Sequence, residues 1–169
     1  MQNYIFDQLI KAGAEFDIKP FGIRAMDAMR LEKSYRLIPR EMSIEYSALE
    51  SGLDRFVKLD KDCDFVGKAA LKAWQERGFE NSFVTLEVHD IHDADARGSE
   101  GIYSSGELIG RATSGGFGFR VNKSLALGLV KTAYAVEGTE LDIEILGKKH
   151  RTTVIAESAF DSDNTALRS

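Results

Sequence analysis

The sequence contains a single cysteine, two prolines and three histidines among its 169 residues. With Cys63 alone, the chain cannot form an internal disulfide, which is typical of a protein from a reducing compartment. Its apolar runs, such as Leu125 to Val130, are far shorter than the roughly 20 residues of a membrane-spanning helix. The first residues lack the basic-then-apolar order of a signal peptide, because Asp7 already interrupts them. We therefore expect a cytoplasmic protein that does not associate with membranes.

The sequence also lacks an excess of positive charge. It has 22 Lys and Arg against 27 Asp and Glu, which gives a formal net charge of -5. An acidic surface repels phosphate backbones, so we expect no nucleic-acid partner. The chain is 43% hydrophobic, which is enough for a real core in one domain or two small ones.

The first half of the chain has helical hydrophobic spacing. Apolar residues at this spacing predict an amphipathic helix over residues 3–16 and a short helix over 22–31. A short strand is predicted at 55–59. Asp64 is a predicted N-cap for a further helix. The expected buried face of that helix consists of Val66, Ala69, Ala70 and Trp74.

The second half has the alternation of β-strands. Val84, Leu86 and Val88 share one face of a strand, and a hairpin is predicted over 140–157 with Gly147 at its turn. Several short strands joined by turn signals predict an antiparallel barrel or sandwich. The fold class is therefore α+β, with a helical or mixed N-terminal part and an all-β C-terminal part that meet near residue 80.

Three stretches could carry chemistry. His89 and His92 lie among aspartates, but a strand would point them to opposite faces, so we favour a solvated loop over a metal site. Thr113 to Phe119 ("TSGGFGF") could let a ligand approach the backbone closely, but we favour a strand that bulges or a loop between strands. Acidic neighbours on both sides of Cys63 disfavour its thiolate, so we expect no cysteine nucleophile.

The segment "FGIRAMDAMRLEKSYR" (Phe21 to Arg36) is the most patterned part of the chain. Asp27 lies three residues from both Arg24 and Arg30, which permits ion pairs within a helix. One interpretation is therefore a set of charges that are solvated or paired within the fold, and the other is a contact with a ligand. The apolar residues on several sides predict that the helix is largely buried. A buried guanidinium needs a partner, and its planar fork suits a carboxylate or a ring with carbonyl and amide edges. From the residues alone, both interpretations stay open.

The combination of several motifs resembles the glycine-cleavage T-protein (aminomethyltransferase) family. "GIRAMDAMRLEKSYR" and "SALESGLDRFVKLDKDCDFVGKAAL" resemble its G-x-R-x-x-D-x-x-R-L-E, P-L-E-x-G-L and K-x-D-F-x-G-K-x-A-L motifs. "GELIGRATSGGFGFRVNKSLALGLV" resembles its barrel signature, with Gly118 and Phe119 where the family has Ser-Pro. "RLEKSYR", "LDRFV" and "FDSDNTALR" are most similar to the branch fused to dimethylglycine and sarcosine dehydrogenases.

This resemblance implies three domains arranged around tetrahydrofolate. Residues 1–79 would be the end of the central folate-binding region, and residues 80–169 the C-terminal aminomethyltransferase β-barrel. Arg24 matches the arginine that contacts the folate, while Asp27 and Arg30 are expected to hold its helix in place. The tyrosine and glycine that often follow in the family are replaced by Ile38 and Pro39. The family's catalytic aspartate and pterin-binding glutamate lie upstream, so no catalytic residue is assigned in this chain.

The implied function is transfer of one carbon from a methylated amine or an aminomethyl donor to tetrahydrofolate. In a dehydrogenase fusion, FAD would occupy an upstream domain. A missing N-terminal half or a companion chain is an expected partner. Two alternatives remain: a folate-dependent demethylase with another donor such as a sulfonium, and a non-catalytic folate-binding or interaction module.

Overall fold

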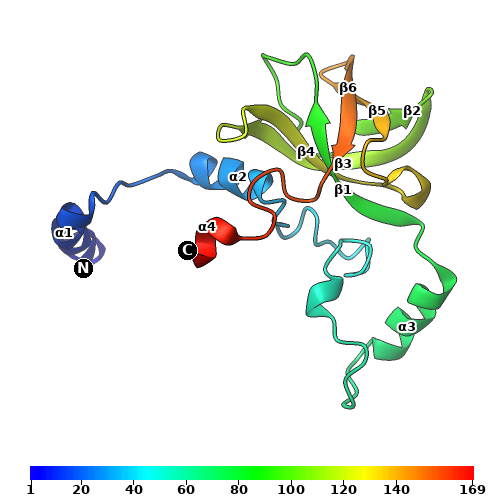
Figure 1. The fold of residues 1–169 in the computed structure, drawn as a ribbon, viewed down its shortest axis with the longest axis horizontal. Helices are drawn as coiled ribbons and strands as arrows, with labels where there is room; N and C mark the ends of the chain where they lie inside the picture. Colours follow the sequence, from blue (N-terminus) through cyan, green and yellow to red (C-terminus); the bar gives the residue numbers. More distant parts are fainter.

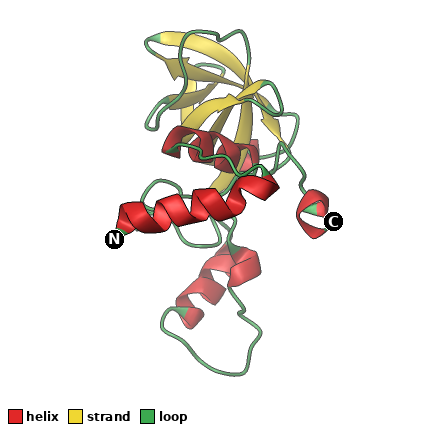
Figure 2. Ribbon diagram, turned by 90° about the vertical axis from the view of Figure 1, so that its left-hand side faces the viewer, coloured by secondary structure: helices red, strands yellow, loops and turns green.

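The computed structural model describes residues 1–169, except the side chain of Leu167. Three helices precede a β-barrel, and a short helix follows it (Figures 1 and 2). The helices are α1 (Gln2–Gly13), α2 (Ile23–Glu32), α3 (Lys68–Arg77) and α4 (Thr165–Arg168), with 3₁₀ turns η1 (Ala14–Phe16), η2 (Asp54–Phe56) and η3 (Thr132–Tyr134). The strands are β1 (Asn81–Val88), β2 (Gly101–Ser104), β3 (Glu107–Gly118), β4 (Lys123–Lys131), β5 (Glu140–Ile145) and β6 (Lys148–Ile155).

The six strands form one closed antiparallel barrel in the order β1-β4-β3-β2-β5-β6. Strand β1 pairs with β4 on one side and with β6 on the other, so that Thr85 lies opposite both Leu127 and Ile155. The pairing of β3 with β4 shifts register between Ala112 and Ser114, which marks a β-bulge. The predicted fold class is confirmed, and the barrel, not the sandwich, is the architecture.

The strands form where the sequence alternates. Leu141, Ile143 and Ile145 of β5 are all buried inside the barrel, as the alternation predicts. The β5–β6 turn places Leu146 at φ 49° and Gly147 at φ 76°, the left-handed conformations that a tight two-residue hairpin needs. The buried core also includes Val84, Leu86, Val88, Ile102, Ala126, Val130 and Val154.

Helix α2 packs against strand β3 because that strand carries glycines at the contact. A Cβ on Gly116 would lie 3.0 Å from the Cδ1 of Leu31, and one on Gly115 would lie 2.5 Å from the carbonyl oxygen of Ala96. The glycine-rich stretch lies mostly in β3, next to the register shift between Ala112 and Ser114, so of the two favoured interpretations the bulged strand is confirmed and the loop is not. Its glycines make room for α2 and for the loop that contains Ala96.

Helices α1 and α3 extend away from the barrel (Figures 1 and 2). The predicted helix at 3–16 is confirmed as α1 followed by η1. Two other predictions are wrong: residues 55–59 form no strand, and α3 begins at Lys68 after the N-cap Gly67, not after Asp64. The expected face of α3 is also wrong, since Val66, Ala69 and Ala70 are exposed and Trp74 is half-buried. Apolar spacing predicts a face, but within the described chain no element covers this one.

Candidate functional site

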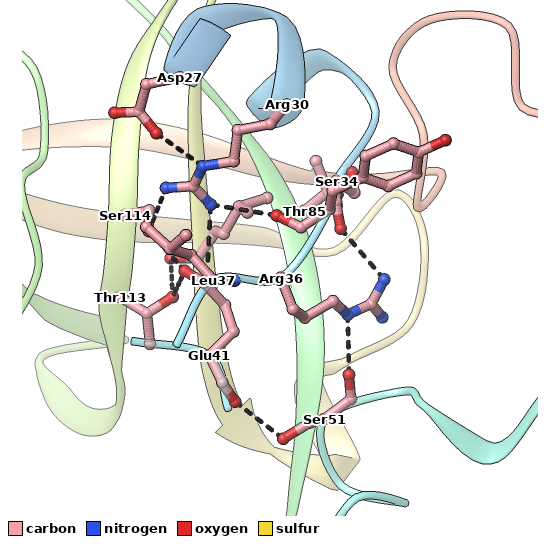
Figure 3. A network of polar contacts seen from close by, with 12 residues as sticks. Asp27, Arg30, Ser34, Arg36, Leu37, Glu41, Ser51, Thr85, Thr113 and Ser114 are labelled. Carbon is pink, nitrogen blue, oxygen red and sulfur yellow. Dashed lines mark hydrogen bonds and ion pairs between the residues drawn. The ribbon is translucent and has the colours of Figure 1, made fainter. Parts of the chain in front are cut away.

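Arg30, near the end of α2, anchors this helix to the barrel (Figure 3). Its Nε donates to Asp27 at 2.6 Å, and its Nη2 donates to the hydroxyl of Ser114 on β3 at 2.8 Å. Its Nη1 reaches the carbonyl oxygen of Tyr35 at 3.1 Å and the carboxylate of Glu41 at 3.3 Å. The expectation that Asp27 and Arg30 hold the helix in place is therefore confirmed for this pair.

Glu41 is completely buried and accepts hydrogen bonds at both oxygens. Oε2 accepts from the backbone N–H of Leu37 at 2.8 Å, besides Arg30. Oε1 accepts from the hydroxyls of Thr113 at 2.6 Å and Ser114 at 2.5 Å. A buried carboxylate is tolerated only when it is paired and hydrogen-bonded, and Glu41 satisfies both conditions.

Arg36 anchors the segment that follows α2, and only 3% of its side chain is exposed. Its guanidinium donates to three backbone carbonyl oxygens, those of Ser34, Ser51 and Gly52. It also pairs with the carboxylate of Glu157 at 2.5 Å, and it lies 3.8 Å from the ring centroid of Phe83. Two of the three arginines of the patterned segment therefore hold the fold together.

Arg24 differs from the other two. Its side chain is exposed on α2, and none of the hydrogen bonds or ion pairs between described residues involves it. The expectation of a largely buried helix is wrong, because Ile23, Met26 and Met29 are 72%, 46% and 48% exposed. Only Leu31 and Glu32, in the last turn, are buried. The helix buries side chains only in its last turn, and the side chain of Arg24 is left accessible.

Arg24 lies beside a cavity of about 670 Å³ between α2, the β3–β4 turn and the C-terminal segment. Most of its accessible wall is apolar. Ligand sites typically have this size and a mainly apolar wall with a few polar groups. The lining residues are Arg24, Ala25, Ala28, Met29, Glu32, Lys33, Phe119, Arg120 and Phe160.

The remaining charged and aromatic residues of the cavity wall include Glu32, Lys33, Arg120 and Phe160. Glu32 is 4% exposed, and its carboxylate accepts from the backbone N–H of Arg120 at 2.7 Å. The guanidinium of Arg120 lies 4.5 Å from the ring centroid of Phe160. Lys33 pairs with the carboxylate of Asp161 at 3.7 Å. The cavity therefore combines aromatic walls with three cations and one buried carboxylate.

The other candidate residues lie elsewhere. His89 shares a hydrogen bond with Thr153 at 2.8 Å, while His92 is exposed in the loop after β1. Cys63 is exposed in the segment before α3. Among the residues that the structure describes, no group of three or more His, Cys, Asp or Glu side chains is placed to hold a metal ion.

Sequence reasoning did not find Lys33, Phe119, Arg120 or Phe160. They come from three segments that are far apart in the chain, and no local pattern joins them. The nearest signal was the stretch that ends at Phe119, whose glycines allow α2 to approach β3.

Two family models match most of the chain. The GCVT N-terminal domain matches residues 1–61, and the glycine cleavage T-protein C-terminal barrel domain matches residues 81–161. The chain belongs to the glycine cleavage T-protein family. The resemblance carried by the sequence motifs is thereby confirmed. None of the helices in the described part of this family member is long and apolar enough to cross a membrane.

The relatives of this T-protein family member include both enzymes expected from the motifs. The mitochondrial dimethylglycine dehydrogenase of Homo sapiens is 38% identical over 164 residues, which are 97% of this chain and 19% of that protein. An aminomethyltransferase of Desulfitobacterium hafniense is 36% identical over 151 residues, or 89% of this chain and 40% of that protein.

A solved structure has the same fold. The chain aligns with the glycine cleavage system aminomethyltransferase T from Bartonella henselae with a TM-score of 0.83 and 25% identity. The alignment covers 95% of this chain and 44% of that one. The chain thus spans less than half the length of these relatives.

Proposed function

We propose that this chain contributes to the transfer of one carbon from a methylated amine or an aminomethyl donor to tetrahydrofolate. The observation that carries the proposal is the apolar cavity beside Arg24 in a member of the T-protein family. The aromatic and cationic walls of this cavity suit a ligand with flat rings and negative charge, as a folate has. Its volume of about 670 Å³ also fits a ligand of this class.

Arg24 is proposed to bind the folate. Arg30 and Arg36 direct their guanidiniums to acids and carbonyl oxygens of the fold, whereas Arg24 has no such partner among the described residues. Its planar group can donate two parallel hydrogen bonds to a ring edge that carries acceptors. The Arg30 and Glu41 contacts hold the last turn of α2 on the barrel, so they fix the position from which Arg24 extends.

In this mechanism the chain positions the acceptor and shields it. Tetrahydrofolate, when bound, supplies the nitrogens that take up the one-carbon unit. Holding the two reactants together lowers the entropic part of the barrier. We assign no catalytic group to this chain, and FAD, in a dehydrogenase fusion, would lie on an upstream domain.

The exposed apolar side chains of α1 and α2 support a missing N-terminal half or a companion chain as partner. Phe6 and Leu9 of α1 are 55% and 60% exposed, and Phe21 before α2 is 67% exposed. Exposed apolar side chains that gather in a patch typically mark a protein contact. We propose that residues 1–79 belong to the central folate-binding region and residues 80–169 to the barrel domain.

Two alternatives share the same cavity. A sulfonium or another methyl donor would react with folate bound in the same way, and a non-catalytic module would bind folate without turnover. The cytoplasmic location stays a prediction, since the dehydrogenase relative of Homo sapiens is named as mitochondrial and the aminomethyltransferase relative is bacterial.

The test is a calorimetric titration of tetrahydrofolate into the native polypeptide that carries this chain. Arg24→Ala is expected to weaken binding about tenfold or more, because a hydrogen bond to a charged group contributes roughly 1.5–3 kcal/mol. Arg77→Ala is the matched control, since it removes another exposed guanidinium on α3, a helix that contributes no residue to the cavity and lies away from α2 (Figure 1). Unchanged affinity in Arg24→Ala would show that the role given to Arg24 is wrong. The 169 residues alone are expected to bind weakly or not at all.

A further inference from the structure

A second guanidinium lines the cavity, and the proposed function does not use it. Arg120 lies in the turn between β3 and β4, whereas Arg24 lies on α2. Within the described chain, the side chain of Arg120 has no hydrogen bond or ion pair, and its guanidinium lies 4.5 Å from the ring centroid of Phe160. The cavity therefore has two guanidiniums on two different elements, and neither is neutralised by an acid of the fold.

The backbone around Arg120 is fixed by its contacts. Its N–H donates to the buried carboxylate of Glu32, and this bond ties the turn to the end of α2. The preceding Gly118 permits the close approach: a Cβ there would lie 3.1 Å from the Cγ of Glu32 and 2.8 Å from the Cγ2 of Val121. Stacking on Phe160 then restricts the guanidinium itself. A side chain whose backbone and guanidinium are both restrained loses less conformational freedom when a ligand binds, which lowers the entropic cost of binding.

The other charged groups of the cavity do not take this role. Lys33 is already bound by Asp161, through its carbonyl oxygen at 2.5 Å and its carboxylate. Glu32 is the one acidic residue among those that line the cavity, and its Oε1 accepts from the backbone N–H of Arg120, not from a guanidinium. Arg120 is thus the cation left available for an anionic group of the ligand at this end.

We propose that Arg120 binds a carboxylate of the ligand, with Phe119 and Phe160 flanking its aromatic middle part. The ligand class is a flat heterocycle joined through an aromatic ring to a carboxylate tail, with the heterocycle at Arg24 and the tail at Arg120. This inference rests on the proposed function and names the part of the folate that meets the second guanidinium. A guanidinium and a carboxylate form two parallel charge-assisted hydrogen bonds, which gives both affinity and orientation.

The experiment compares two probes on the native polypeptide that carries this chain. The first probe is tetrahydrofolate, and the second is 6-methyltetrahydropterin, which has the heterocycle but no tail. Arg120→Ala is expected to weaken tetrahydrofolate binding about tenfold while leaving the affinity for the pterin unchanged. Arg120→Lys keeps the positive charge but loses the planar guanidinium. Its affinity for tetrahydrofolate is expected to lie between those of wild type and Arg120→Ala. A higher salt concentration is expected to reduce the difference in tetrahydrofolate affinity between wild type and Arg120→Ala, because salt screens charge pairs.

The outcomes separate this inference from the function on which it rests. If Arg120→Ala binds tetrahydrofolate like wild type while Arg24→Ala binds weakly, the tail assignment is wrong and the proposed function stands. If Arg120→Ala weakens both probes equally, Arg120 supports the cavity and does not bind the tail, which also refutes the inference. A wild-type polypeptide that binds neither probe would refute both proposals. Thermal unfolding of each variant and of Arg77→Ala checks that the fold is intact.

Discussion

Replacing the buried Glu41 by leucine tests whether the polar network between α2 and the barrel acts as a unit. Leucine is nearly the same size as glutamate but accepts no hydrogen bonds, so the groups that donate to Glu41 stay buried without this acceptor. Loss of one partner of a buried ion pair costs about 3–5 kcal/mol. Two donors retain other partners, since Arg30 keeps Asp27 at 2.6 Å and the Thr113 hydroxyl turns to the Leu127 carbonyl oxygen at 3.1 Å. The expected loss is therefore near the lower end, about 3 kcal/mol.

A milder change separates charge from hydrogen bonding. In Glu41→Gln, the amide oxygen still accepts from Arg30 and from the Leu37 N–H, while the Ser114 hydroxyl rotates to accept from the new NH₂ group. We expect a loss of about 1 kcal/mol, the usual size of one hydrogen bond. In the double variant Arg30→Met with Glu41→Leu, the losses should fall short of additivity by at least about 1 kcal/mol.

The assay is urea unfolding followed by far-ultraviolet circular dichroism, with free energies compared at equal slope. Glu107→Leu is the matched control, because Glu107 pairs with Lys131 on the exposed outside of the barrel, where an ion pair contributes little. A loss below about 1 kcal/mol in Glu41→Leu, or full additivity in the double variant, would refute the description of this network as one unit.

Two further predictions concern the glycine contact and the C-terminal segment. Gly115→Ala should destabilise the fold by about 1–3 kcal/mol in the same unfolding assay, because its Cβ would lie 2.5 Å from the carbonyl oxygen of Ala96. Gly22→Ala is the control and should not destabilise the fold in this way, because its Cβ would meet no atom within 4 Å. Equal losses of stability in the two variants would contradict the prediction. The hydrogen bond donated by Thr165 holds the pKa of Asp161 below its usual 3.8. The Asp161 carboxylate therefore stabilises the C-terminal segment above that pH, and this stabilisation is lost as the pH falls through the lower pKa of the folded state. We expect the C-terminal segment of the wild type to become more susceptible to proteolysis between pH 5 and pH 2, roughly the range over which such a carboxylate titrates. Asp161→Asn should remove this pH dependence. A variant with the same pH dependence as wild type would exclude Asp161 as its source.

The strands could be predicted because their signal is local. In β5, each second residue is apolar, and the Leu146–Gly147 turn follows at once, so eight residues specify a hairpin. The closed order of the six strands did not follow from such patterns, because the pairing of β1 with β6 joins residues that are far apart in the chain, such as Thr85 and Ile155. The periodicity was compatible with a barrel or a sandwich, and only the family motifs favoured the barrel.

The positions of the helices were predicted to within a few residues, but their burial was not. Apolar residues at helical spacing indicate that a face exists, yet they do not say whether the chain also contains its partner. Met26 and Trp74 show this limit, since both lie on such faces and neither is buried. The buried pair of Arg30 with Glu41 was also beyond the sequence, because its geometry depends on Ser114, 84 residues after Arg30.

Closure of the barrel through its first and last strands has a consequence for biosynthesis. Thr85 of β1 cannot meet Ile155 of β6 until residue 155 has left the ribosome. Until then β1 has only β4 beside it, and its other edge offers unpaired amide and carbonyl groups to any neighbouring nascent chain. The time taken to translate the residues between β4 and Ile155 therefore sets how long that unpaired edge persists, and slow translation of this stretch would favour aggregation on polysomes.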